Sequence, residues 1–182
     1  MLLMILTLSC CSSQNPNFYQ PISIKTSEID YPQFNKTVLL KTLILPAEVA
    51  RPQITTQGKD GYSLKIDEFN RWGASPDKLF QNALRQDLNA YLPNAQIEVQ
   101  TPLKKNYQYA VAVEINTLSG QLNKEAILEA EYIILNSNGK SIKSGKLKES
   151  IAIKRQYADY VIAQSHMLSA LAAQIAADLN NL

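Results

Sequence analysis

Few side chains in this chain are of the kinds that carry out catalysis or bind metal. It has one histidine, His166, and two cysteines, Cys10 and Cys11, which are adjacent near the N-terminus. A catalytic histidine works with a nucleophile or an acid, and a zinc site needs several His, Cys or acidic ligands at close spacing. Neither companion stands near His166 in the sequence, so we interpret it as a surface or packing residue of a helix.

Two carboxylate pairs are the other candidates for chemistry. Asp67-Glu68 and Glu129/Glu131 could hold Ca²⁺ or act as acid and base. Asp67-Glu68 is more simply explained as charge at a helix start, and Glu129 and Glu131 fall on one face of a strand. Gly58 and Gly61 lack the strand and helix that flank a phosphate-binding loop. The sequence therefore predicts no enzyme, no metal site and no cofactor.

Composition places the chain among ordinary folded proteins. It has 182 residues, 46% of them hydrophobic and 19% charged, which is enough to bury the core of one domain. Eighteen Lys and Arg against sixteen Asp and Glu give a net charge of +2. The basic pair Lys104-Lys105 reads as a solvated loop, and without a dense basic block no nucleic-acid partner is expected.

The N-terminal residues predict a lipid anchor. The run from Met1 to Leu8 is apolar but shorter than the roughly twenty residues that span a bilayer, and it resembles the end of a secretory signal. A small residue before a cysteine, here Ser9-Cys10, resembles the bacterial lipobox, in which the cysteine is lipidated. Cys11 is the alternative, because Leu8 lies where that motif places leucine. The other interpretation is a buried apolar tail with incidental cysteines.

These features divide the chain into three parts: a signal segment (1–10), a polar tether (11–17) and one domain (18–182). No Asp follows Cys10. By resemblance to the sorting rule of enterobacterial lipoproteins, this predicts the periplasmic face of the outer membrane, where two or more acyl chains anchor a protein stably.

Hydrophobic periodicity predicts the elements of the domain. Helices are expected at 77–92, after Ser75-Pro76 as cap and first turn, and at 157–180. Turns are expected at 58–61 and 136–140. Strands are expected at 18–24, 37–45, 51–56, 62–66, 95–100, 107–118, 126–135 and 141–153. The fold class is α/β (α+β): a mixed, largely antiparallel sheet with two main helices packed on it.

The stretch 51–92 holds the candidate contact residues. They are Arg51 and Gln53 in the first strand of the predicted hairpin, and Arg71 and the only tryptophan, Trp72, after its second strand. Structurally, Arg51 pairs with an acid and Trp72 fills the core beneath a helix. Functionally, an exposed Arg/Trp pair is typical of a hot spot for a partner protein. Both interpretations remain open from the sequence.

The order of motifs resembles a known family, the PqiC-type or ABC-type transport auxiliary lipoproteins. The resemblance is carried by Phe18-Tyr19, Leu45-Pro46, Arg51-Pro52-Gln53-Ile54, Phe69 to Pro76, and Tyr157 to Ser165 at the start of the last helix. The chain departs from the family pattern at Phe18, where a tyrosine is usual, at Val49-Ala50, and after Trp72.

This resemblance implies a non-catalytic lipoprotein that docks an MCE-domain transporter to the outer membrane, as a ring of subunits. Such systems move lipid between membranes or maintain the envelope. The alternative is a periplasmic carrier, which would hold lipid or another ligand in an apolar pocket between sheet and helix. A hydrolase would need a nucleophile beside His166.

Overall fold

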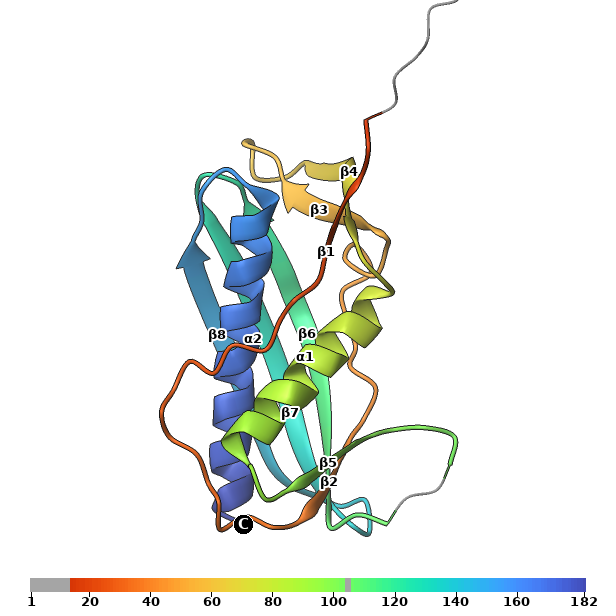
Figure 1. Cartoon of the computed structure of the whole chain (residues 1–182), viewed down its shortest axis with the longest axis vertical. Coiled ribbons are helices and arrows are strands. Elements are labelled where there is room, and N and C mark those ends of the chain that lie inside the picture. The colour runs from red at the N-terminus through yellow and green to blue at the C-terminus, as the bar shows by residue number, and fades with distance from the viewer. Residues whose placement is uncertain (1–13, 104–105) are drawn as a thin grey trace, which may run out of the picture.

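The computed structural model describes residues 14–103 and 106–182 (Figure 1). Cys10, Cys11 and the pair Lys104-Lys105 lie outside the described residues. The elements follow in the order β1 (Asn17–Tyr19), β2 (Thr37–Leu40), β3 (Gln53–Gln57), β4 (Leu64–Trp72), α1 (Pro76–Tyr91), β5 (Gln96–Val99), β6 (Tyr109–Gln121), β7 (Glu125–Asn136), β8 (Ser141–Ala152) and α2 (Tyr157–Asn180).

The strands form two mixed sheets. The larger has the order β5-β2-β6-β7-β8, with β2 parallel to both of its neighbours and with β6, β7 and β8 antiparallel. The smaller has the order β1-β4-β3, with β1 parallel and β3 antiparallel to β4. Both helices lie on one face of the larger sheet (Figure 1). The α+β class with two main helices is thus confirmed, although the strands divide between two sheets.

Alternation along the long strands builds the core. On β6, Val111, Val113 and Ile115 point toward the helices and are buried, and on β7 the same holds for Leu128 and Ile134. The expected stripe of α2 packs against them. All of its members are buried: Tyr160, Gln164, Met167, Leu168, Leu171, Ile175 and Leu179. The alternate apolar residues of the strands and the apolar stripe of the helix, which repeats every 3.6 residues, therefore pack together in one layer.

A glycine on β8 lets a large ring close this layer. Gly145 is the ladder partner of Tyr132, and a Cβ on Gly145 would lie 2.4 Å from the Tyr132 ring. The ring therefore extends across β8, and its hydroxyl donates to Asp178 Oδ2 on α2 at 2.6 Å. Burial and the Asp178 carboxylate raise the pKa of Tyr132. This contact fixes the C-terminal part of α2 to the sheet.

An extended segment, residues 20–27, crosses the two helices and is called the strap here (Figure 1). Its backbone bonds to helix side chains instead of to a strand. The Ile22 N–H donates to Ser165 Oγ at 3.1 Å, and the Ile24 N–H donates to Asp87 Oδ1 at 3.0 Å. The Ser23 hydroxyl donates to the same Asp87 oxygen at 2.6 Å. The strap joins α1 and α2 along their outer side.

Asp87 makes the strap sensitive to pH. It is fully buried, and burial raises its pKa to about 6 despite the two hydrogen bonds it accepts. Since the folded-state pKa lies above the ordinary value, protonation stabilises the folded state, and this contribution is lost as pH rises through about 6. Asp87→Asn should therefore remove this pH dependence, while the amide oxygen still accepts both bonds. The amide NH2 would replace Oδ2, which is buried without a partner among the described residues, so the variant should gain little net stability at pH 7.5.

The measurement is urea denaturation at pH 5 and pH 7.5. Asp87→Asn should weaken the pH dependence, whereas Asp30→Asn, at an exposed carboxylate paired with Lys25, should leave it as in the wild type. An unchanged pH dependence in the Asp87 variant would contradict the assignment.

Three expectations were wrong, in addition to the end of the strand expected at 37–45, which stops at Leu40. The strand expected at 18–24 ends at Tyr19, because the helices satisfy the strap backbone. Asp67-Glu68 lies inside β4 rather than at a helix start, and Asp67 Oδ1 accepts the N–H groups of Phe69 and Asn70 at 2.8 Å. Ser75 precedes α1 but makes no side-chain cap, since its hydroxyl donates to Asp77.

Candidate functional site

The smaller sheet brings the four predicted contact residues together. Gln53 and Arg71 are ladder partners on β3 and β4, and the Trp72 N–H donates to the Pro52 carbonyl at 2.8 Å. Arg51 comes immediately before Pro52. Three of the four predicted residues line one open groove of about 430 Å³, called the Arg51 groove here. Its lining is Phe18, Ala50, Arg51, Pro52, Arg71, Trp72, Ala74, Ser75 and Pro76.

Trp72 forms the floor of the groove. It is only 4% exposed and packs edge-to-face on Phe80 of α1, with ring centroids 5.3 Å apart and an interplanar angle of 77°. Pro76 in the first turn of α1 is buried beside it. Trp72 therefore belongs to the core, as the structural interpretation proposed, and its contact with a partner stays a prediction.

Two buried N–H groups at the groove have no acceptor within the described part of the chain. Arg51 Nε and Trp72 Nε1 are both buried, and neither has a hydrogen-bond partner among the described residues. An unpaired buried donor costs about 1–3 kcal/mol, so such groups call for an explanation. The guanidinium of Arg51 can donate in a fixed fork to a carboxylate or to a carbonyl. Because both atoms are buried, an acceptor from another molecule could reach them only if the side chains around the groove move apart.

One carboxylate, that of Glu68, contacts both Gln53 and Arg71 at the exposed side of this site. Glu68 accepts from Gln53 Nε2 at 3.2 Å and lies 3.7 Å from Arg71 Nη1. Both contacts are exposed and contribute little to stability. The acid expected for Arg51 is thus found beside Arg71, and Arg51 forms no ion pair among the residues that the structure describes.

The far side of the hairpin is tied to α2. Burial alone would raise the pKa of Asp67, but the N–H groups that bond its carboxylate lower it. Burial and the Asp67 carboxylate raise the pKa of Tyr157, in the first turn of α2, to about 12. The two carboxylates of the expected pair thus have different partners: Asp67 faces Tyr157 of α2, and Glu68 faces Gln53 and Arg71 at the surface.

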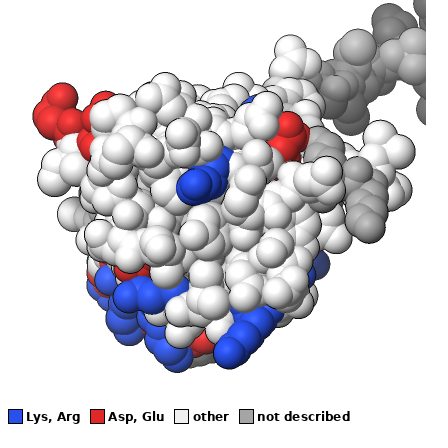
Figure 2. Space-filling view, turned by 90° about the horizontal axis from the view of Figure 1, so that it is seen from below, with Lys and Arg blue, Asp and Glu red and all other residues white. Residues whose placement is uncertain are grey.

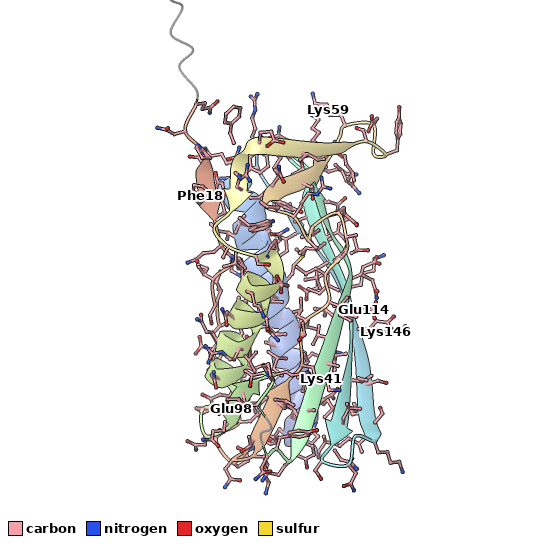
Figure 3. All side chains as sticks on the ribbon, turned by 90° about the vertical axis from the view of Figure 1, so that its right-hand side faces the viewer. Phe18, Lys41, Lys59, Glu98, Glu114 and Lys146 are labelled. Atoms are coloured by element: carbon pink, nitrogen blue, oxygen red, sulfur yellow. The ribbon has the colours of Figure 1, made fainter. Side chains whose placement is uncertain are left out.

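A second groove lies on the larger sheet, on the face away from the helices. It has a volume of about 690 Å³, an apolar floor that includes Ala112 and Ile133, and a wall from the segment after β2 that includes Ile44. Charged side chains flank it, and Figure 3 shows Glu114 and Lys146 on this side of the molecule. Sequence reasoning missed this groove. The signal was the mixture of apolar and charged residues at the outward positions of β7.

The expected Glu129/Glu131 pair lies on that same face and is neutralised by β8. Lys148 Nζ lies 2.6 Å from Glu129 and Lys146 Nζ lies 2.7 Å from Glu131. Lys148 lowers the pKa of Glu129. These cross-strand ion pairs stabilise the ladder and leave each carboxylate committed to a lysine.

His166 lies on α2, half-buried, beside a shallow groove. The other residues of that groove are Ile151, Ala152, Ile153, Lys154, Asp159, Ile162 and Ala163. None of the residues that line this groove is a serine, threonine or cysteine.

Comparisons with known proteins agree with this architecture. The family model described as "ABC-type transport auxiliary lipoprotein component" matches residues 20–176. An uncharacterised protein of known crystal structure is 17% identical, with a TM-score of 0.75 over 91% of this chain and 99% of its own. Protein XCC0632 from Xanthomonas campestris, of family DUF330, is 12% identical, with a TM-score of 0.72 over 88% of this chain and 92% of its own. These two likenesses concern the fold.

No curated protein sequence matched the chain. The family model nevertheless covers most of the domain, from the start of the strap to the last turns of α2. The chain therefore belongs to the family of ABC-type transport auxiliary lipoprotein components.

Proposed function

We propose that this protein is a non-catalytic docking subunit, held to the periplasmic face of the outer membrane by lipid on Cys10, that joins an MCE-domain transporter to that membrane. The match of residues 20–176 to an auxiliary component of ABC-type transport carries the proposal. The system would move lipid between membranes or maintain the envelope, and several copies would surround the transporter as a ring.

The Arg51 groove is the proposed contact with the transporter. Arg51 Nε and Trp72 Nε1 have no acceptor among the described residues, and a partner that brings a carboxylate or a backbone carbonyl would satisfy them. Buried aromatic and arginine side chains of this kind are typical of interface hot spots. Gln53 and Arg71 would contact the partner at the rim.

The packing of the interior favours docking over the alternative, a carrier of lipid or other ligand. A carrier would hold its cargo between sheet and helices, yet the side chains that meet there, such as Leu128, Leu168 and Leu171, are fully buried in one cluster. The groove of about 690 Å³ lies on the opposite, open face of the sheet. Co-purifying lipid without any partner protein would support the carrier instead.

Replacing both cysteines by serine tests the anchor. The Cys10→Ser/Cys11→Ser variant should move from the membrane to the soluble fraction, because roughly 0.8 kcal/mol for each buried methylene is lost with the acyl chains. Fractionation followed by immunoblotting measures the change. The single variants are the controls: if Cys10 carries the lipid, Cys11→Ser alone stays with the membrane. A double variant that still sediments with membranes would refute the anchor.

A further inference from the structure

Exposed apolar side chains concentrate on the smaller sheet. Thirteen large apolar side chains of the described residues are exposed, and five of them belong to β1, β4 or the turn between β3 and β4. We call these five residues the hairpin patch: Phe18, Tyr62, Leu64, Ile66 and Phe69. Such a concentration on a small area marks a surface that meets another molecule or a membrane.

The ladder register places three of them on one face. Phe18 pairs with Arg71, which pairs with Gln53, while Ile66 pairs with Thr55 and Leu64 with Gln57. Ladder partners share a face, and residues two apart on a strand also share a face. Gln53, Thr55 and Gln57 are alternate residues of β3, so Phe18, Ile66 and Leu64 share one face of the sheet, across a register shift between Gln53 and Ile54. Thr55 is buried on that face and donates to the Glu48 carbonyl, so the exposed part of the face is formed by β1 and β4.

The turn between β3 and β4 extends this face with a fixed tip. Asp60 Oδ1 accepts the N–H groups of Tyr62 and Ser63, and Gly61 supplies the positive φ of 80° that the turn requires. The Asp60 carboxylate is thereby used within the turn. Tyr62, 87% exposed, is held outward, and the exposed cation Lys59 lies at the same tip (Figure 3).

The hairpin patch lies at the end of the molecule where the described chain begins (Figure 1). Six residues lie between Cys10 and Asn17 at the start of β1, and the seven steps from one to the other span about 25 Å at full extension. The 24 residues of α2 alone extend about 36 Å along the body, away from this end. A lipid on Cys10 would therefore keep this end of the domain within about 25 Å of the bilayer, whereas the far end of α2 reaches it only if the domain lies on its side.

The opposite end differs in chemistry. Viewed from there, Lys and Arg side chains gather along one side and the rest of the surface is mostly uncharged (Figure 2). That end carries the polar turn from Asn136 to Lys140, between β7 and β8. Tyrosine and lysine beside aliphatic side chains, as at the hairpin patch, suit the boundary between lipid headgroups and acyl chains.

We infer that the hairpin patch rests on the lipid bilayer that holds the N-terminal anchor, so that the long axis of the domain stands away from the membrane. The inference depends on the anchoring proposed above. It gives the Arg51 groove, which shares Phe18 with the patch, a position close to the membrane surface. A transporter bound in the Arg51 groove would therefore contact this protein close to the membrane surface.

Fluorescence of an added tryptophan tests this orientation. Full-length lipidated protein carrying Tyr62→Trp is placed in vesicles of phosphatidylethanolamine and phosphatidylglycerol, with or without bromine on the acyl chains. Ser137→Trp, on the exposed turn at the opposite end, is the matched control. Both variants keep the buried Trp72, and its signal is removed by subtracting the wild type.

The added indole of Tyr62→Trp should emit at shorter wavelength on vesicles than the control and lose fluorescence with brominated lipid, while Ser137→Trp shows neither change. Solvent-like, unquenched emission at position 62 would overturn the inference and leave the patch to a protein partner. Equal quenching at both positions would also overturn it. Protein that fails to float with the vesicles would refute the anchor itself and the inference with it, and flotation distinguishes this result from the others.

Discussion

Replacing Trp72 by alanine should lower the free energy of unfolding by about 3–5 kcal/mol, the largest effect expected of a single side chain here. Trp72 is 4% exposed and packs edge-to-face on Phe80, in the place where the end of β4 meets the start of α1. Alanine would leave a cavity bounded by α1 and the smaller sheet. That cavity would separate the small sheet from the rest of the core.

Trp72→Phe is the matched control for this prediction. Phenylalanine keeps an aromatic contact with Phe80 and removes the indole N–H that has no acceptor among the described residues. Its cost should therefore be well below that of alanine, about 1 kcal/mol, since the lost packing is partly offset by the lost unpaired donor. Urea denaturation followed by far-UV circular dichroism measures both, because Trp72 fluorescence is absent from the variants. Equal losses for the two variants would contradict a packing role.

Local patterns in the sequence predicted the elements that depend on neighbours in the chain. The helix after Ser75-Pro76 and the last helix follow from apolar spacing, and both were confirmed. The turn at Gly139, where φ is 78°, joins β7 and β8 as the Asn-Gly sequence indicated. In these elements the hydrogen bonds and the buried face lie within a few residues of each other.

Long-range pairings could not be predicted in the same way. The parallel contacts of β1 with β4 and of β2 with β5 and β6 join segments that are far apart in the sequence. No local pattern records which strands share a sheet, so two sheets appeared as one. The strand expected at 37–45 likewise ends at Leu40, and only an isolated bridge from Ile44 to Glu114 continues it.

Buried polar residues were the other omission. Asp87 falls on the same helical stripe as Ala83, Leu84 and Tyr91, a position that apolar periodicity assigns to the core. A charged residue on such a stripe is itself a signal that a partner covers it. Here that partner is the strap, and only the folded chain shows that Ser23 supplies its bond.

For the predicted contact residues too, the sequence motifs could be identified directly, but their spatial arrangement could not. The sequence shows that the Arg51-Pro52-Gln53-Ile54 motif is followed by Arg71-Trp72, in the order that carries the family resemblance. The ladder pairing of Gln53 with Arg71 brings the two motifs side by side, on the neighbouring strands β3 and β4 of the smaller sheet. The unpaired donors of Arg51 and Trp72 could be found only from the structure.

Arg51 is the residue at which function and stability should separate most clearly. Its Nε is buried without an acceptor among the described residues, so Arg51→Ala removes an unpaired donor and should leave the free energy of unfolding unchanged or slightly higher. If the transporter supplies that acceptor, the same substitution removes a hot spot of about 2 kcal/mol or more, which is roughly a 30-fold loss of affinity. Capture of an MCE-domain protein from detergent-treated native membranes, identified by mass spectrometry, measures the loss. Arg155→Ala, at an exposed arginine outside the groove, is the control and should retain capture.

Arg51→Lys separates charge from geometry in the same assay. Lysine keeps the positive charge but cannot donate in the planar fork of a guanidinium, so capture should fall nearly as far as with alanine if a carboxylate is held by two bonds. Recovery with lysine would indicate a charge effect alone. Full capture by Arg51→Ala, with wild-type stability, would refute the groove as the docking site. If Arg51→Ala lowers stability as much as it lowers capture, Arg51 is a structural residue. The loss of capture would then follow from the weakened fold and not from a lost contact with the transporter.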